Sequence, residues 1–151
     1  MSHKKPPTVS LSLTVRCADV ASALDFYAKA FGAVESFRLS APDGSIAHAE
    51  FDIGDTHLFI SGESPEWLAH AMPEGTTASC LFAIDSEDCD RAYAQAIAAG
   101  ATSVAAPEDH FWGSRDAIVR DPFGYRWCFG QKTEDITPEE IARRAKELFG
   151  A

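Results

Sequence analysis

The sequence predicts an α+β fold built from two similar modules, each with one strand, one helix and three further strands, followed by a C-terminal helix. The main observation is an internal echo: residues 24–33 and residues 92–101 are both helix-like runs that stop at a glycine, Gly32 or Gly100. Each copy also follows a short apolar strand and precedes strands that close on a glycine-containing turn. A duplicated unit of this kind predicts two half-modules that share one cavity.

Composition limits the class of protein. The 151 residues are expected to form one domain, and 46% hydrophobic with 24% charged residues is typical of a soluble globular protein. No apolar run approaches the ~20 residues that span a bilayer, so we expect a cytoplasmic protein with no membrane partner. The net charge of −10 argues against nucleic acid as a partner, because phosphate binding needs positive charge. The four cysteines form no C-x-x-C pair, which indicates free thiols.

The first module is predicted at about residues 9–63. Residues 9–17 alternate apolar and polar side chains, which is typical of a half-buried strand. Asp19 is placed to cap a helix with one apolar stripe, and Gly32 ends that helix. The remaining strands of this module are predicted at residues 33–39, 46–53 and 57–61.

The second module is predicted at about residues 77–131, after a linker that Trp67 and Leu68 are expected to pin down. Ser86 is the expected cap of a helix over residues 87–99. Beyond the module, the capping box at Thr137, with proline at the first helical position, predicts a C-terminal helix over residues 138–149. The strands of the second module are predicted at residues 80–84, 102–105, 116–120 and 125–130, with a loop at 107–113 and a turn at 121–124.

Several segments in order carry a family resemblance: residues 23–33, 42–55, 111–115 and 120–127, the last containing the turn Asp-Pro-Phe-Gly. Together they resemble the vicinal oxygen chelate superfamily, which includes glyoxalase I, bleomycin-resistance proteins and extradiol dioxygenases. The last segment and the residues that follow it are similar to the PhnB-like branch in particular. The resemblance implies paired βαβββ modules in a cupped mixed sheet, the glyoxalase/bleomycin-resistance fold. It also implies a homodimer with a ligand inside the cup.

The same resemblance locates the metal-ligand positions of the metal-dependent members, two in each module. In those members the ligands are typically His or Glu. Carried over by position, these places fall on Ser12, Phe59, Ser79 and Cys128, at offsets that match the spacing of the two glycines. Two serines, a phenylalanine and a lone cysteine do not supply the nitrogen and oxygen shell that such ions need. We therefore expect no metal and no cofactor.

Strand parity assigns other side chains to the inner face of the cup. Ser12 and Thr14 share one face of the first strand, and His48 and Glu50, two positions apart, point the same way. We interpret this face as ligand-lining rather than solvated. Two roles stay open for His48 and Glu50: an acid/base or metal-binding pair, or a contact that orients a ligand without turnover. We favour the second.

The second module contributes further candidates. Phe111, Trp112 and Arg115 lie on a loop that is expected to close over the cup, where the indole would stack on a planar ligand. Trp112 would alternatively plug the junction between the modules. Cys128 would need a lowered pKa and a nearby base to act as a nucleophile, so we interpret it as an inert thiol. Trp127 is adjacent to Cys128 in the same predicted strand, so its side chain points to the opposite face and is expected in the core under a helix.

The predicted function is therefore binding of a small, aromatic or cationic molecule in the cup without a metal, as drug-sequestering relatives do. One alternative is a metal-dependent lyase, isomerase or dioxygenase that uses His48, Glu50 and His57. Another is a structural or regulatory dimer with an empty cup. The predicted ligand-binding set is Ser12, Thr14, His48, Glu50, Phe59, Ser79, Phe111, Trp112, Arg115 and Cys128.

Overall fold

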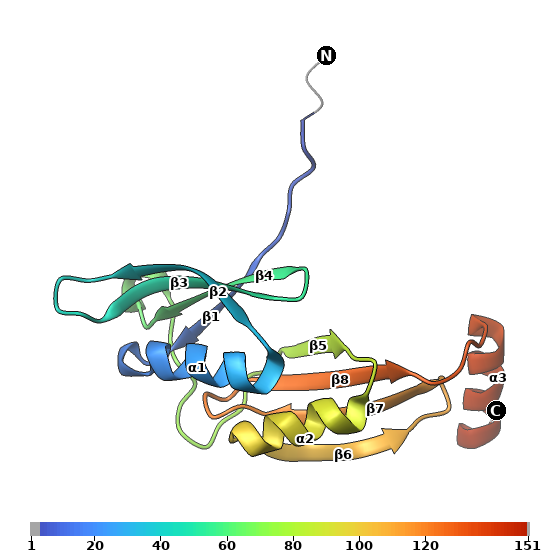
Figure 1. Cartoon of the computed structure of the whole chain (residues 1–151). Helices are drawn as coiled ribbons and strands as arrows, with labels where there is room; N and C mark the ends of the chain where they lie inside the picture. Colours follow the sequence, from blue (N-terminus) through green and yellow to red (C-terminus); the bar gives the residue numbers. More distant parts are fainter. Residues whose placement is uncertain (1–3, 151) are drawn as a thin grey trace. The chain divides into compact units, whose positions relative to one another are not determined.

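The computed structural model describes residues 4–150, which form two compact units, each with its own four-stranded mixed sheet (Figure 1). The first unit runs through Ala28 and includes residues 32–71, and the second includes residues 29–31 and continues from Met72. In both sheets the first strand of the module pairs in parallel with the last strand, and the other pairs are antiparallel. The predicted α+β class, with two βαβββ modules and a C-terminal helix, is confirmed.

The first unit packs one face of its sheet against a helix. Leu13 and Ile60 are buried on that face, and Tyr27 of the helix stacks on Phe51 with ring centroids 5.4 Å apart. Because side chains alternate along a strand, the intervening residues lie on the other side, which we call the open face of the first sheet. The elements are β1 (Leu11–Val15), α1 (Val20–Phe31), β2 (Val34–Ser40), β3 (Ile46–Ile53) and β4 (Thr56–Gly62).

The second unit repeats this arrangement. Trp127 and Phe129 are buried, as predicted for core residues, and Phe82 stacks on Trp127 with ring centroids 4.5 Å apart. The alternate residues form the open face of the second sheet. The elements are β5 (Leu81–Asp85), α2 (Cys89–Ala99), β6 (Thr102–Asp109), β7 (Ser114–Arg120), β8 (Arg126–Lys132) and α3 (Pro138–Phe149).

A buried carboxylate organises the hairpin between β7 and β8. Asp121 is only 1% exposed and accepts hydrogen bonds from the backbone N–H groups of Phe123 and Tyr125. Its second oxygen accepts from the indole N–H of Trp127 at 2.9 Å. Gly124 completes the turn with φ of +98°. This turn fixes the register of the two strands that carry most of the open face of the second sheet.

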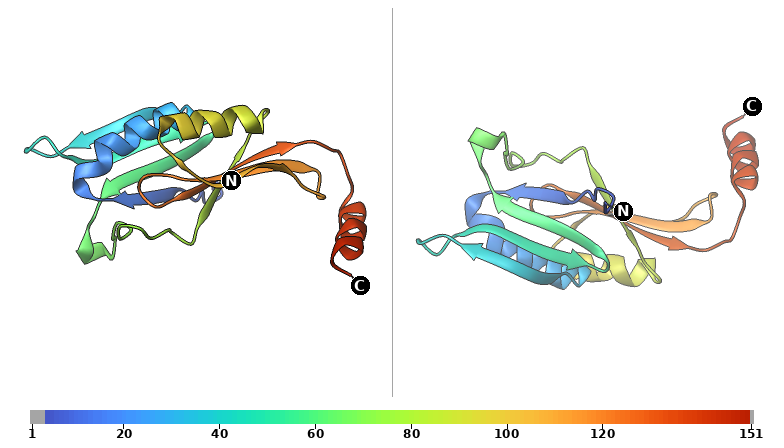
Figure 2. Two further views of the ribbon diagram at one scale, coloured as in Figure 1. Left: turned by 90° about the horizontal axis from the view of Figure 1, so that it is seen from below. Right: turned by 90° about the horizontal axis from the view of Figure 1, so that it is seen from above.

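The C-terminal helix α3 begins as predicted. The side chain of Thr137 accepts a hydrogen bond from the backbone N–H of Glu140, and Pro138 occupies the first turn. Arg144 fastens the helix, because its guanidinium donates to the Phe111 carbonyl and pairs with Glu134 at 2.9 Å. Both views in Figure 2 show α3 beyond the end of β8 and apart from α2. None of the helices in the described part of the chain is long and apolar enough to cross a membrane.

The two predicted helix caps differ in outcome. Asp19 is the N-cap residue of α1, as predicted, but it makes no side-chain capping bond, because a short 3-10 turn (Cys17–Asp19) precedes α1 and places Asp19 in a helical backbone conformation. In the second unit α2 starts at Cys89, and its cap is Asp88, whose carboxylate accepts from the backbone N–H of Arg91. Ser86 instead accepts from the backbone N–H of Asp88.

Two segments between strands also differ from prediction. Trp67 and Leu68 were expected to pin the linker, yet they are 82% and 84% exposed, so their side chains bury little surface. The strand predicted near residues 102–105 continues as β6 to Asp109, which shortens the loop expected at 107–113. The extension pairs Glu108 with Asp116 across the hairpin and is accommodated by irregularities in register.

Candidate functional site

The open face of the first sheet carries a row of four side chains, one from each strand. Ser12 is paired with Phe59, Phe59 with Glu50, and Glu50 with Phe37. Residues that are paired on neighbouring strands point to the same face, so these side chains form a continuous row across the sheet. Sequence parity identified the first three, but Phe37 was missed because β2 shows no clear alternation. Aromatic side chains therefore occupy two of the four positions in this row.

A second row lies beside it. Thr14 is paired with Ser61, and His48 with Leu39. The His48 ring lies 5.5 Å from the Phe59 ring and 6.4 Å from the Phe37 ring, measured between centroids. The structure therefore brings five of the predicted binding residues onto one face of one unit. They are Ser12, Thr14, His48, Glu50 and Phe59.

Four titratable side chains form a chain of contacts along this face. Glu50 Oε1 lies 3.7 Å from His48 Nε2 and 3.5 Å from His57 Nε2. On its other nitrogen, His57 Nδ1 lies 2.6 Å from Asp52 Oδ1. The hydrogen bond with Asp52 raises the pKa of His57, and Glu50 raises it further. His57 therefore favours the protonated form, in which both ring nitrogens donate to carboxylates.

A hollow of about 640 Å³ lies at one end of the open face and includes Ser12, Thr14 and His48 in its lining. This volume falls in the range of ~300–1,000 Å³ that is typical of small-molecule sites. Two lining residues were missed by sequence reasoning. They are Trp67, predicted only as a linker anchor, and Cys17, which follows β1. Only the local fold brings the 62–69 segment over the end of β1, and no sequence spacing predicts that approach.

The donor set does not fit a divalent ion at the positions that metal-dependent relatives use. Ser12 and Phe59 are direct partners on neighbouring strands, and in the second sheet the corresponding partners are Ala83 and Cys128. Phenylalanine and alanine have no donor atom, and hydroxyl groups are poor replacements for His or carboxylate. Across residues 4–150, no three His, Cys, Asp or Glu side chains are arranged so that they could hold a metal ion.

The register of the second sheet changes the assignment of Ser79. This residue is exposed, lies before the first residue of β5, and uses its carbonyl to accept from Arg126. Ala83 occupies the strand position that corresponds to Ser12, because it is the partner of Cys128. Cys128 does lie on the open face of the second sheet. Burial, together with the nearby charge of Asp116, raises the pKa of its thiol, so Cys128 is protonated at neutral pH.

The three loop candidates of the second unit point in different directions. Arg115 lies on the helix side of its sheet, where its guanidinium pairs with Asp90 at 2.8 Å and Asp109 at 3.2 Å. It therefore ties β7 to α2 rather than facing the open side. Trp112 is half-exposed and stacks on His110 with ring centroids 4.1 Å apart. Phe111 packs edge-on against Phe149 of α3.

Comparison with known proteins places the whole chain among relatives of one kind. The model of the glyoxalase/bleomycin resistance protein/dioxygenase superfamily matches residues 10–129. The uncharacterized protein Mb0911c of Mycobacterium bovis is 36% identical over 144 residues, which cover 93% of both chains. The uncharacterized protein At5g48480 of Arabidopsis thaliana is 31% identical over 135 residues, which cover 84% of this chain and 80% of the relative.

Solved structures give the same answer for the fold. TioX from Micromonospora sp. ML1 superposes with a TM-score of 0.64 at 25% identity, over 83% of this chain and 99% of TioX. A glyoxalase/bleomycin resistance protein/dioxygenase from Nocardioides superposes with a TM-score of 0.65 at 21% identity, over 91% of each chain. At that identity the likeness concerns the fold alone.

Proposed function

This chain belongs to the glyoxalase/bleomycin resistance protein/dioxygenase superfamily, and we propose that it binds a small organic molecule, without a metal, on the open face of its first sheet. The observation that carries the proposal is the row of Ser12, Phe59, Glu50 and Phe37 beside a hollow of about 640 Å³. Aromatic surface with a few converging polar groups is the usual composition of a small-molecule site.

Each part of this face has a defined role in the proposal. Phe59 and Phe37 supply apolar surface for a planar group, because a ring that leaves water against them buries area worth about 25 cal/mol per Å². Glu50 accepts hydrogen bonds from the ligand, and it is held in place by the two imidazoles beside it. Ser12 and Thr14 supply hydroxyl groups that both donate and accept. The ligand is thus oriented by neutral donors and one carboxylate.

The proposal is tested by fragment binding followed residue by residue. Neutral, anionic and cationic aromatic fragments are titrated against labelled protein, and backbone NMR shifts are mapped. We expect shifts on β1, β3 and β4 at open-face positions, and about tenfold weaker binding in Phe59→Ala, which corresponds to ~1.4 kcal/mol. His70→Ala, which removes an exposed histidine of the same unit, should bind as the unaltered chain does. Fragments that bind Phe59→Ala unchanged would refute the proposal.

Metal analysis of the purified protein separates this proposal from the metal-dependent enzyme. Sequestration without a metal predicts no stoichiometric divalent ion. An ion bound at one equivalent, and lost in His48→Ala, would replace the proposal with an enzyme that uses His48, Glu50 and His57. We further propose a cytoplasmic homodimer of the PhnB-like branch. The branch rests on the motif at residues 120–127 and the helix α3, and the dimer on apolar side chains exposed along β2.

A further inference from the structure

A second hollow, of about 360 Å³, lies on the open face of the second sheet, and every residue that lines it belongs to the second unit. We propose that it binds a small organic ammonium or guanidinium ion. Its lining consists of Asp85, Trp112, Gly113, Ser114, Asp116, Gly130, Gln131, Lys132, Glu134, Asp135 and Ile136.

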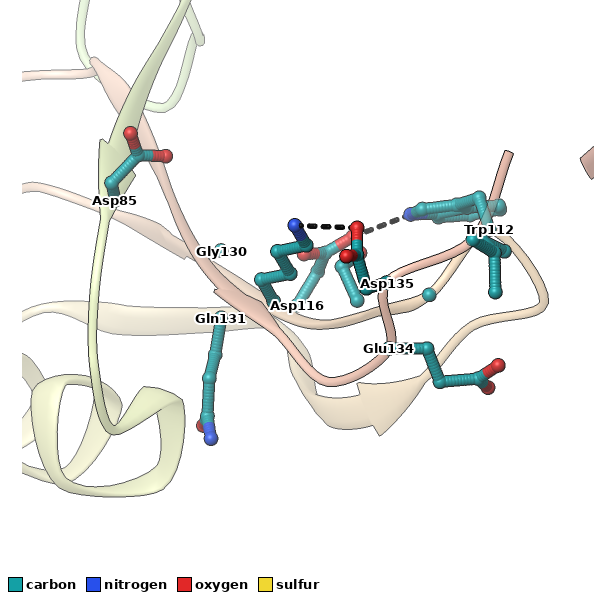
Figure 3. A pocket seen from close by; sticks show the side chains of 11 residues that line it. Asp85, Trp112, Asp116, Gly130, Gln131, Glu134 and Asp135 are labelled. Atoms are coloured by element: carbon teal, nitrogen blue, oxygen red, sulfur yellow. Dashed lines mark hydrogen bonds and ion pairs between the residues drawn. The ribbon is translucent and has the colours of Figure 1, made fainter. Parts of the chain in front are cut away.

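The centre of this hollow is a gap between two carboxylates. Asp85 is paired with Gly130 on β8, and Gly130 is paired with Asp116 on β7, so all three lie in one row on the same face. Figure 3 shows Asp85 and Asp116 on either side of Gly130, with Gln131 directed to the opposite side. Neighbouring strands are ~4.8 Å apart, so the two acidic residues start ~10 Å apart with no side chain between them. A cationic head group fits over this glycine.

Asp116 is held in a fixed orientation by its neighbours. Its Oδ2 accepts from the Ser114 hydroxyl at 2.9 Å and from the Trp112 indole N–H at 3.2 Å. Oδ2 accepts both of these hydrogen bonds. The other oxygen, Oδ1, faces Gly130, and a Cβ atom added to Gly130 would lie 3.4 Å from it. A carboxylate that is oriented before the ligand arrives loses little conformational freedom on binding, which favours affinity.

The charges around the hollow favour a cation. Lys132 is paired with Asp135 at 3.0 Å, and Arg144 with Glu134 at 2.9 Å, so each nearby cation already has a carboxylate partner. Within residues 4–150, neither Asp85 nor Asp116 pairs with a lysine or an arginine. The net charge of −10 adds a field that attracts cations to the protein. The imidazole of His110 lies near the same carboxylate, with Nε2 3.9 Å from Asp116 Oδ2, and it carries a positive charge only when it is protonated. Two carboxylates without a lysine or arginine partner, beside an indole, are a complementary site for an ammonium group.

The exposed indole of Trp112 favours a cation that carries an apolar group. The Trp112 ring is parallel to the His110 ring, at 6° between planes, so one indole face is covered by the imidazole. The indole is still 42% exposed, and its N–H edge is anchored on Asp116. A cation that carries an organic group would therefore place its charge at Asp116 and its apolar part against the indole. A metal ion or an anion gains nothing from this indole.

The test uses benzylammonium as the probe, with benzyl alcohol as its neutral counterpart. Both are titrated into the full-length protein, and the Trp112 indole and Gly130 amide resonances are followed by NMR. We expect benzylammonium to shift both resonances and to bind about tenfold or more tightly than benzyl alcohol, the difference that ~1.4 kcal/mol produces. Equal binding of the two probes, or no shift with millimolar benzylammonium, would overturn the proposal.

Two variants locate the site. Gly130→Ala fills the gap, and it should fold, because the added Cβ meets Asp116 at an ordinary contact distance of 3.4 Å and Gly130 does not need a positive φ. Asp116→Asn keeps an acceptor for Trp112 and removes the charge. Both should weaken benzylammonium binding at least tenfold. Glu74→Gln, which removes an exposed carboxylate of the same unit outside the lining, is the matched control and should change it less than about twofold.

The outcomes separate this site from the one proposed above. Phe59→Ala lies in the first unit and leaves every lining residue of this hollow intact, so it should not alter the benzylammonium shifts at Trp112. If Gly130→Ala failed to fold, the charge test with Asp116→Asn would still decide. Retention of full binding in both Gly130→Ala and Asp116→Asn would show that the cation binds elsewhere.

Discussion

Replacement of Asp121 by alanine is expected to be among the most destabilising single changes in the second unit. The carboxylate is 1% exposed and accepts from two buried donors, the Tyr125 N–H at 3.0 Å and the Trp127 indole N–H at 2.9 Å, and from the Phe123 N–H at 2.8 Å. A hydrogen bond to a charged group contributes ~1.5–3 kcal/mol, so the two buried bonds alone account for ~3–6 kcal/mol. We expect a loss of about 4 kcal/mol, a large part of the ~5–15 kcal/mol that stabilises a typical domain.

The size of the loss in Asp121→Asn separates hydrogen bonding from simple packing. The asparagine keeps one oxygen for the backbone donors, but its amide N–H₂ group then faces the Trp127 indole N–H, which is also a donor. This variant should lose about 1–3 kcal/mol, the cost of one such bond. Urea unfolding followed by the fluorescence of buried Trp127 measures both losses, and Asp135→Ala, on an exposed ion pair, should change stability by less than ~0.5 kcal/mol. A loss below ~1 kcal/mol in Asp121→Ala, or equal losses in the two Asp121 variants, would refute this account of the hairpin.

Three further outcomes are expected. Gly124→Ala should destabilise the second unit in urea unfolding, because φ is +98° and the new Cβ would lie 2.9 Å from the Met72 side chain; unchanged stability would contradict the tight turn. The contact with Asp52 raises the pKa of His57 in the folded protein. The stability that this contact contributes is therefore fully present below pH 6.5, the pKa of His57 in the unfolded chain, and it is lost as the pH rises through the higher pKa of the folded protein. Asp52→Asn should therefore lower the free energy of unfolding at about pH 6 and change it much less at about pH 9. An equal loss at both pH values would contradict a role for protonated His57. Val34→Ser should shift the proposed dimer toward monomer in light scattering, because this residue is 65% exposed on the edge strand β2; an unaltered dimer would place the interface elsewhere.

The fold was predictable because local signals agreed with tertiary structure over most of the chain. Alternation at residues 9–17 and the glycine stops at Gly32 and Gly100 each correspond to observed elements. The cap of α2 was not predictable from residue type. Ser86 and Asp88 are both acceptable cap residues, and the choice between them depends on where the chain leaves β5, which no single residue type determines.

The candidate site was predictable only where a single strand decides the orientation. Parity alone placed His48 and Glu50 on one face, since residues two apart in a strand point the same way. Arg115 was assigned to a closing loop, although it lies within β7 and pairs with Asp90 of α2, a contact between residues far apart in the sequence. The gap over Gly130 depends on the register between three strands, and a glycine has no side chain whose pattern would indicate it.

Comparison of equivalent rows shows how the two sheets have diverged. In the first sheet the row through Phe59 contains a carboxylate and two aromatic rings, whereas the row through Cys128 contains only Ala83, Ile118 and Ala105 as its partners. The second sheet has the carboxylates Asp85 and Asp116 one row further along, where the equivalent row of the first sheet has Thr14 and His48. The duplicated scaffold therefore carries different side-chain chemistry at equivalent strand positions: Glu50 corresponds to Ile118, and His48 corresponds to Asp116. A metal-binding row needs several matched nitrogen or oxygen donors, whereas rows of such different composition favour a separate organic ligand on each sheet.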